Sequence, residues 1–237
     1  MKILAIIPAR YHSTRFPGKP LTSIYGKSMI RRVYEQAIQV NAFSKVIVAT
    51  DDDRIYHNVK GFGGEAMMTS SEHQSGTDRC GEVIIQSKDE FDVVVNIQGD
   101  EPFIQPAQLE LLLTAFDDKD TQIATLAKRV SSLEEIENNH IVKVVFSVFH
   151  KALYFSRAAI PFPRNRYENY YKHIGIYAYR AEVLKKIIRL EQTPLEMAES
   201  LEQLRWLENG FTIHVVETEI ETIAIDTEED LKKISPL

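Results

Sequence analysis

The chain has 237 residues, of which 44% are hydrophobic and 26% charged, and its formal net charge at pH 7 is −6. This composition is that of an ordinary globular protein with a sizeable core, and the acidic balance argues against nonspecific nucleic-acid binding. No apolar run approaches the roughly 18 residues of a membrane span. The single cysteine, Cys80, cannot form an internal disulfide. We therefore expect a cytoplasmic protein without membrane insertion.

The first half of the chain alternates between apolar runs and helical periodicity. Strands are expected at residues 3–7, 45–49, 66–69, 91–97 and 122–128, and helices at 27–40, 54–60, 77–87 and 106–116. Strands that alternate with helices of about ten residues indicate βαβ units and a parallel sheet covered on both faces.

The regular alternation of expected strands and helices ends after Arg129. Strands are expected at 142–148, 152–155, 173–179 and 212–216, helices at 180–189, 194–209 and 227–234, and an ordered excursion at 157–171. The sequence thus predicts one α/β domain over residues 1–237, with a Rossmann-like, mostly parallel sheet and an inserted sub-lobe at about 129–179.

A basic loop follows the first expected strand, within the stretch from Ile6 to Leu21. From Met1 to Tyr34 the chain has no Asp or Glu but seven basic residues: Lys2, Arg10, Arg15, Lys19, Lys27, Arg31 and Arg32. A basic loop at the end of a buried strand, inside an acidic protein, indicates a local anion site.

Three further polar clusters follow expected strands, at His73–Arg79, Asn96–Pro102 and Ala224–Leu231. Ligands of open parallel sheets bind at the carboxyl ends of the strands. The carboxylates of Asp100 and Asp226 would lie there opposite the basic loop. Carboxylates beside phosphates need a bridging cation, so the pattern favours a Mg²⁺–nucleotide site.

Each of these features also has a simpler structural explanation. A basic loop can be a solvated surface, and Gly76 can belong to a plain helix cap. From the residues alone, Asp226 before Thr227 is a better helix cap than metal ligand. His173 fits a structural histidine, and Cys80 a small buried hydrophobic residue.

The motifs together resemble one enzyme family. They are IIPARYHSTRFPGKPL, HQSGTDRC, VVVNIQGDEPFI, ALYFSRAAIPF, YKHIGIYAYR and AIDTEEDL, in this order. From Ile3 to Leu231 the chain resembles the 3-deoxy-D-manno-octulosonate (Kdo) cytidylyltransferases, or CMP-Kdo synthetases. The opening motif is shared with other sugar nucleotidyltransferases, whereas the later motifs are more specific to the Kdo branch.

The resemblance implies the sugar nucleotidyltransferase fold and a reaction of CTP with Kdo that gives CMP-Kdo and pyrophosphate for lipopolysaccharide biosynthesis. It also implies Mg²⁺ as cofactor and a homodimer formed through the inserted lobe. The alternatives are a cytidylyltransferase for another acidic sugar, such as 8-amino-Kdo or a nonulosonate, and a non-catalytic nucleotide-binding module.

The family's residue roles carry over to the matching positions. Arg10, Lys19, Asp100 and Asp226 would be catalytic, and Asp100 and Asp226 would bind the metal. CTP would be bound by Ala9, Arg10, Arg15, Lys19, Ser75, Gly76, Arg79 and Gln98. The sugar would be bound by Gln98, Arg157, His173, Tyr177, Glu202 and Gln203. The last motif departs from the family pattern, with Ala224 in place of Gly and Glu228 in place of Pro.

Overall fold

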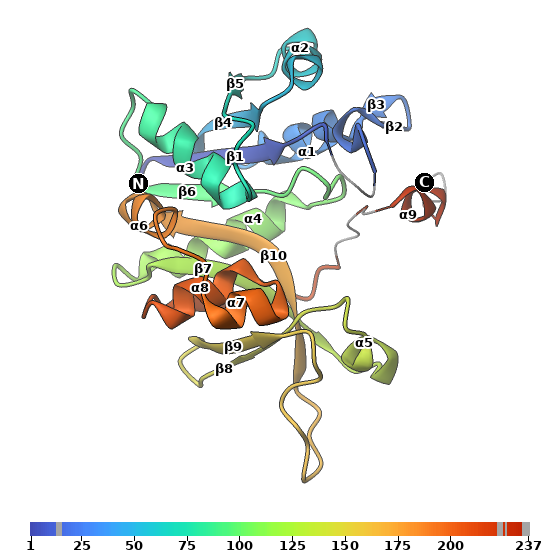
Figure 1. The fold of residues 1–237 in the computed structure, drawn as a ribbon, viewed down its shortest axis with the longest axis vertical. Coiled ribbons are helices and arrows are strands. Elements are labelled where there is room, and N and C mark those ends of the chain that lie inside the picture. Colours follow the sequence, from blue (N-terminus) through green and yellow to red (C-terminus); the bar gives the residue numbers. More distant parts are fainter. Residues whose placement is uncertain (13–15, 222–224, 226, 234–237) are drawn as a thin grey trace. The chain divides into compact units, whose positions relative to one another are not determined.

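The computed structural model describes residues 1–12, 16–221, 225 and 227–233. The chain forms two compact units (Figure 1). Unit 1 comprises Met1–Glu110 and Thr222–Leu237, and unit 2 comprises Leu111–Glu221. The expected sub-lobe at 129–179 falls within unit 2.

Unit 1 contains a parallel sheet in the order β6-β1-β4-β5. Its strands are β1 (Ile3–Ala9), β4 (Phe43–Thr50), β5 (Ala66–Met68) and β6 (Val93–Asn96). All four residues of β6 are buried, as are the first five of β1. Burial of a strand on both sides explains why its sequence is a nearly unbroken apolar run. The predicted α/β class and the parallel pairing are confirmed.

Helices connect these strands, as the alternating pattern predicts. They are α1 (Met29–Ala37), α2 (Asp53–Gly61), α3 (Gly76–Gln86) and α4 (Pro106–Leu113), and α9 (Glu228–Lys233) lies near the C-terminus. A 3₁₀ turn, η1, covers Lys19–Leu21. Among the described residues, no helix is both long and apolar enough to cross a bilayer.

Element boundaries in unit 1 differ from the prediction by one to three residues, and two of these differences have a clear local cause. The helix expected from Lys27 begins at Met29, because β2 (Ser23–Ile24) and β3 (Lys27–Ser28) form an antiparallel hairpin. Its turn is made by Tyr25 and Gly26, both with positive φ (49° and 78°). A turn of this kind suits a two-residue hairpin connection.

Strand β1 also continues through Pro8 to Ala9, where a break was expected. Ile6 faces β6, since its carbonyl accepts the N–H of Ile97. Pro8, two residues later, faces the same side, but the β1–β6 pairing has ended at Ile6 and Asn96. The missing N–H of Pro8 therefore costs the sheet no hydrogen bond, as is usual for proline in strands.

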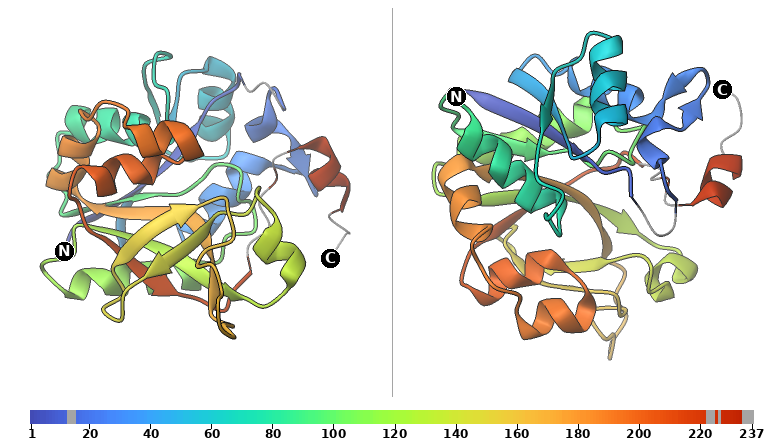
Figure 2. Two further views of the ribbon diagram at one scale, coloured as in Figure 1. Left: turned by 60° about the horizontal axis from the view of Figure 1, so that its bottom comes forward. Right: turned by 45° about the horizontal axis from the view of Figure 1, so that its top comes forward.

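Unit 2 contains a mixed sheet in the order β11-β7-β10-β8-β9 (Figure 2). Its strands are β7 (Ile123–Val130), β8 (Lys143–Phe146), β9 (Ala152–Ser156), β10 (Tyr170–Arg180) and β11 (Ile213–Glu217). Only β7 and β11 pair in parallel. The helical elements are η2 (Thr114–Asp117), α5 (Leu133–Glu137), α6 (Ala181–Ile187), α7 (Pro194–Glu199) and α8 (Glu202–Glu208). Residues 157–169 contain no helix or strand, as expected for the excursion.

The single helix predicted at 194–209 is wrong. Ser200 adopts a left-handed conformation (φ 53°) that ends α7, and α8 begins at Glu202. The two helices are joined by a buried ion pair in which Arg205 Nε and Nη2 lie 2.7 and 2.5 Å from the Glu196 carboxylate. Helical periodicity continues across the break, so the sequence pattern does not reveal it.

Replacing Ser200 by glycine is expected to raise the free energy of unfolding by about 0.5–1 kcal/mol. A side chain in the left-handed region costs roughly 1–2 kcal/mol, which exceeds the entropic cost of adding a glycine. Urea denaturation measures the change. The matched control is Ser87→Gly at the end of α3, where φ is −65° and no strain is relieved. Equal destabilisation by both substitutions would contradict the prediction.

Candidate active site

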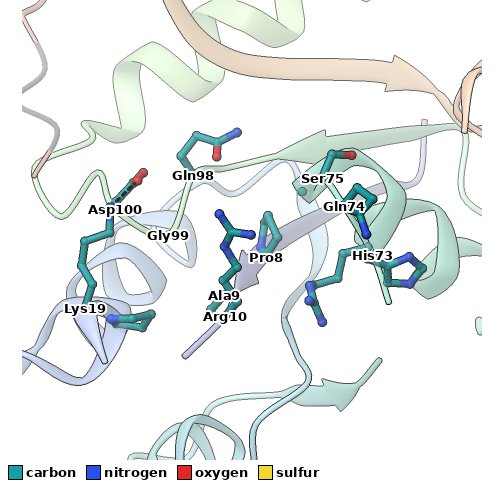
Figure 3. A pocket seen from close by; sticks show the side chains of 13 residues that line it. Pro8, Ala9, Arg10, Lys19, His73, Gln74, Ser75, Gln98, Gly99 and Asp100 are labelled. Carbon is teal, nitrogen blue, oxygen red and sulfur yellow. Dashed lines mark hydrogen bonds and ion pairs between the residues drawn. The ribbon is translucent and has the colours of Figure 1, made fainter. Parts of the chain in front are cut away.

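A pocket opens in unit 1 at the carboxyl ends of β1 and β6 and at the start of α3 (Figure 3). It is lined by Pro8, Ala9, Arg10, Lys19, Pro20, His73, Gln74, Ser75, Gly76, Arg79, Gln98, Gly99 and Asp100. The structure thus brings together every expected CTP-binding residue except Arg15, which lies outside the described residues. His73, Gln74 and Gly99 also line the pocket, although the sequence analysis gave them no role.

The opening loop is folded back on itself, which places Lys19 at the pocket. The N–H of Gly18 donates to the carbonyl of Tyr11 (2.8 Å), and Gly18 has a φ of 72°. A Cβ atom on Gly18 would come within 3.2 Å of the Tyr11 ring. On α2, the Arg54 guanidinium lies 3.2 Å from the centre of that ring. Tyr11 and Arg54 therefore support the loop from outside the pocket, although the sequence had suggested no role for either side chain.

Three segments far apart in sequence meet at Lys19. Its Nζ lies 2.7 Å from Asp100 Oδ2 and donates to the carbonyl of Ile225 (3.0 Å). The N–H of Ile225 in turn donates to the carbonyl of Asp100 (3.0 Å). Both charged side chains are partly accessible, 14% for Lys19 and 31% for Asp100. A positive and a negative group thus lie together at the edge of the pocket. Asp226 lies outside the described residues.

Glu101, the next residue after Asp100, lies in a different environment. Its side chain is buried, and Oε2 has no hydrogen-bond partner among the described residues. Burial, with a smaller contribution from the Asp100 charge, raises the pKa of Glu101 to about 8. At neutral pH the Glu101 side chain is therefore largely protonated and uncharged.

The backbone around Pro8 is closely packed, and two glycines make this possible. A Cβ atom on Gly99 would lie 2.8 Å from the carbonyl oxygen of Pro8. A Cβ on Gly76 would lie 3.1 Å from the Pro8 ring. Gly76 begins α3, whose N-cap Ser75 forms a capping box with Asp78. The start of a helix favours an anion, because its first N–H groups have no partner within the helix.

Arg79 lies on α3 and lines the pocket, but its guanidinium is already engaged. Nη1 donates to Thr69 Oγ1 (2.5 Å), and Nη2 lies 3.4 Å from Asp51 Oδ2. The side chain is buried. These contacts suit a residue that fixes the wall of the pocket between α3 and β5, rather than one that moves onto a phosphate.

His73 forms a second connection at the same wall. Its Nε2 lies 2.5 Å from Glu82 Oε2, and the same carboxylate oxygen accepts the N–H of Ser70 (2.8 Å). The loop before α3 is therefore tied to the helix by a side chain of that helix.

The residues expected to bind the sugar lie in unit 2, apart from Gln98, which lines the unit 1 pocket. His173 and Tyr177 lie on β10 with ring centres 5.3 Å apart, and Tyr177 contacts Trp206 (5.0 Å). The Tyr177 hydroxyl is buried and has no hydrogen-bond partner among the described residues. Burial, Tyr179 and Glu202 all raise the pKa of Tyr177. The structure thus brings His173, Tyr177 and Glu202 together.

Gln203 and Arg157 complete the expected set. Gln203 is buried on α8, and Arg157 follows β9 immediately. Phe155, two residues before Arg157, contacts His173 edge to face at 5.0 Å. This contact links β9 to the group on β10.

His173 is expected to make the protein less stable in mild acid. Its Nε2 lies 2.9 Å from Thr125 Oγ1, and loss of hydration lowers the pKa of His173 from 6.5 to about 3. Between these values the unfolded chain binds a proton that the folded chain does not, so stability falls as pH drops below 6.5, by at most about 1.4 kcal/mol per pH unit.

The test is urea denaturation of His173→Asn at pH 7 and pH 5. The wild-type loss of stability between these pH values should exceed that of the variant by up to about 2 kcal/mol, the product of this slope and 1.5 pH units. Identical pH dependence of the two proteins would contradict the assignment.

The site combines four features: a parallel α/β sheet, a basic loop at the end of its first strand, a helix that starts at a glycine, and a carboxylate beside a lysine. Together they are typical of a nucleotide-binding protein of the α/β class. Comparison with known proteins agrees. Residues 4–223 match the family model described as "Cytidylyltransferase".

Two curated relatives and one solved structure narrow the class. The 3-deoxy-manno-octulosonate cytidylyltransferase of Bacteroides thetaiotaomicron is 56% identical (98% of this chain, 96% of the relative), and that of Geobacter metallireducens is 47% identical (99% and 96%). A structure of CMP:2-keto-3-deoxy-manno-octonic acid synthetase complexed with CTP is 47% identical, with a TM-score of 0.94 over 98% of this chain and 96% of that one. The chain belongs to the 3-deoxy-manno-octulosonate cytidylyltransferase family of nucleotidyltransferases.

The family predicted from the motifs is therefore confirmed, and so is the predicted fold. The 4-diphosphocytidyl-2C-methyl-D-erythritol synthase of Anaerococcus prevotii shares the fold at 15% identity, with a TM-score of 0.66 over 98% of this chain and 95% of that one.

Proposed function

We propose that the protein transfers a cytidylyl group from CTP to Kdo and releases pyrophosphate, as a step of lipopolysaccharide biosynthesis. The observation that carries the proposal is the unit 1 pocket, in which Arg10, Lys19 and Asp100 meet the glycine-containing start of α3. A relative 47% identical to this chain has been solved in complex with CTP.

In this proposal the positive side chains of the opening loop bind the triphosphate. Lys19 and Arg10 line the pocket, and Arg15 would join them. Fixed positive charge stabilises the negative charge that spreads over the phosphate oxygens in the transition state. Ala9, Ser75, Gly76, Arg79 and Gln98 would frame the cytidine and its α-phosphate.

Mg²⁺ is the proposed cofactor, with Asp100 and Asp226 as ligands. The residues present fit it: Asp100 offers an accessible carboxylate in the pocket, and Ile225, which precedes Asp226, is hydrogen-bonded to Asp100. Within the described residues no cluster of three or more potential ligands occurs. Mg²⁺ binds in proteins through one or two carboxylates together with the substrate's phosphates, the donors that Asp100, Asp226 and CTP would supply. When bound, the ion would neutralise phosphate charge and polarise the reacting phosphorus.

The chain's own contribution is alignment and charge. The nucleophile is the anomeric hydroxyl of the sugar, so no covalent enzyme intermediate is required. The hydroxyl oxygen loses its proton to solvent and forms a bond to the α-phosphorus of CTP, and the bond from that phosphorus to the pyrophosphate oxygen breaks. The Lys19 ammonium is held between Asp100 and Ile225 and would stabilise the charge of the phosphates.

The sugar would be bound by Arg157, His173, Tyr177, Glu202 and Gln203, with Gln98 between nucleotide and sugar. Arg157 would bind the carboxylate of the sugar, since a guanidinium forms paired hydrogen bonds with a carboxylate. His173 is neutral at physiological pH, because its pKa is lowered to about 3, and would act as a hydrogen-bonding group rather than as a cation.

We further propose a homodimer in the cytoplasm, formed through residues 129–179. Leu133 and Phe162 in this segment are 72% and 84% exposed. Exposed large apolar side chains are typical of interaction surfaces. The lone cysteine, Cys80, is buried and not in a disulfide, which fits a reducing compartment. Sedimentation of the purified protein would test the dimer.

The test of the proposed function is pyrophosphate release with CTP, Mg²⁺ and one acidic sugar at a time. The proposal expects the highest kcat/KM with Kdo. A higher value with an 8-amino-Kdo or a nonulosonate would favour the alternative of another acidic sugar. CTP binding without turnover of any sugar would favour a non-catalytic module.

A further inference from the structure

A buried lysine in unit 2 lies beside Arg157. The side chain of Lys143 is fully buried on β8. Its Nζ lies 2.7 Å from the carbonyl oxygen of Asn138, 2.6 Å from that of Ile141 and 2.7 Å from that of Arg157. An ammonium has three N–H donors and accepts no hydrogen bond, so donors and acceptors match one to one. A neutral amine would leave one carbonyl without a donor, so this cage favours a charged Lys143.

Glu199, at the end of α7, contacts Arg157 from the side opposite Lys143. Its Oε2 accepts the N–H of Arg157 (2.9 Å), and its Oε1 accepts the hydroxyl of Ser156 (2.6 Å). The backbone carbonyl of Glu199 accepts Nε of Arg157 (2.8 Å). The peptide groups on either side of Arg157 are thus fixed by opposite charges, the N–H by Glu199 and the C=O by Lys143.

Within the described part of the chain, the acceptors that hold the guanidinium of Arg157 are neutral. Nε bonds the carbonyl of Glu199, and Nη1 bonds the carbonyl of Asn139 (3.3 Å). No carboxylate of the described residues forms an ion pair with it. Two of its five N–H groups therefore bond to these carbonyls. The other three N–H groups, and the positive charge of the guanidinium, are available to a ligand.

We propose that Lys143 and Glu199 are positioning residues that aim Arg157 at the carboxylate of the acidic sugar without neutralising it. The inference rests on the proposed function, in which Arg157 binds that carboxylate. If the Glu199 carboxylate paired with the guanidinium, the substrate would have to displace it. Here the carboxylate accepts hydrogen bonds from the Ser156 hydroxyl and the Arg157 backbone N–H, and it also attracts the positive charge of Lys143. Rigidity and free charge are thereby combined on one arginine.

The experiment compares Lys143→Met with the wild type by steady-state kinetics. We expect the KM for Kdo to rise at least tenfold, while the dissociation constant of CTP changes less than twofold. Lys185→Met is the matched control, because Lys185 is partly exposed on α6 and its ion pair among the described residues is with Glu182 on the same helix. An equal weakening of CTP binding by Lys143→Met, or no change in the KM for Kdo, would overturn the proposal.

A double-mutant cycle separates positioning from a general structural role. In an Arg157→Ala background, Lys143→Met should add less than twofold to the KM for Kdo, because it acts through Arg157. If the double variant instead raised the KM for Kdo by the product of the two single effects, the proposal would be overturned. If Lys143→Met does not fold, Glu199→Gln, which keeps the size of the side chain, takes its place in the cycle with the same expected outcome. An unchanged KM for Kdo in Arg157→Ala alone would instead show that the sugar-binding role proposed for Arg157 is wrong.

Discussion

Replacing Lys19 by methionine is expected to lower kcat/KM for CTP by roughly 10²–10³-fold, the usual effect of removing one fixed donor that stabilises transition-state charge. Lys19 is the charged group that joins the opening loop to Asp100 and Ile225. Methionine keeps the length and apolar stem of the side chain but removes the charge and all three donors. The measurement is the initial rate of pyrophosphate release over a range of CTP concentrations at saturating Kdo.

Lys27→Met is the matched control for this substitution. Lys27 lies on β3 in the same basic segment, but its Nζ pairs with Glu35 (2.6 Å), and it does not line the pocket. We expect wild-type kinetics from this variant within about twofold. If both variants lose activity to the same extent, the general positive field of the segment matters and the position of Lys19 does not.

Replacing Asp100 by asparagine is expected to lower kcat by roughly 10²–10³-fold. Asparagine has nearly the same shape, so the turn after β6 should be retained, but the amide is a poorer ligand for a hard cation than a carboxylate. The residual rate should also require a higher Mg²⁺ concentration for saturation. Titration of Mg²⁺ at fixed CTP measures both effects.

Asp89→Asn is the control for the loss of one carboxylate. Asp89 is half exposed and pairs with Lys2 Nζ at 3.1 Å, away from the residues that line the pocket. Its Mg²⁺ dependence should match that of the wild type. Full turnover by Asp100→Asn at the wild-type Mg²⁺ concentration would show that Asp100 is not a metal ligand.

Much of unit 1 could be predicted from the sequence, because the features involved are local. Buried strands on a parallel sheet give apolar runs such as Val93–Val95, and a helix cap such as Asp52 precedes its helix directly. The pocket followed from one topological rule, since polar residues after such strands meet at the same edge. Lys19 and Asp100, 81 residues apart, were expected to lie opposite each other, and they form an ion pair.

What the sequence did not reveal depends on backbone conformation or on contacts with backbone atoms. The left-handed Ser200 and the hairpin turn at Tyr25 require positive φ at residues that rarely adopt it. The environment of Arg157 depends on carbonyl groups of Asn139 and Glu199, which every residue type could supply. The residue types at these two positions therefore do not predict the backbone contacts of the Arg157 guanidinium. From the sequence, the buried Lys143 cannot be distinguished from an ordinary exposed lysine at the start of a strand.

The contact between Lys19 and Ile225 has a consequence for synthesis of the protein on the ribosome. The strands of the unit 1 sheet all lie within the first 96 residues, whereas the carbonyl that accepts a hydrogen bond from Lys19 is supplied 129 residues after the last of them. A nascent chain can therefore form its sheet early, but the surroundings of Lys19 become complete only when the C-terminal segment has emerged. Affinity for the nucleotide should accordingly arise only after the sheet has formed.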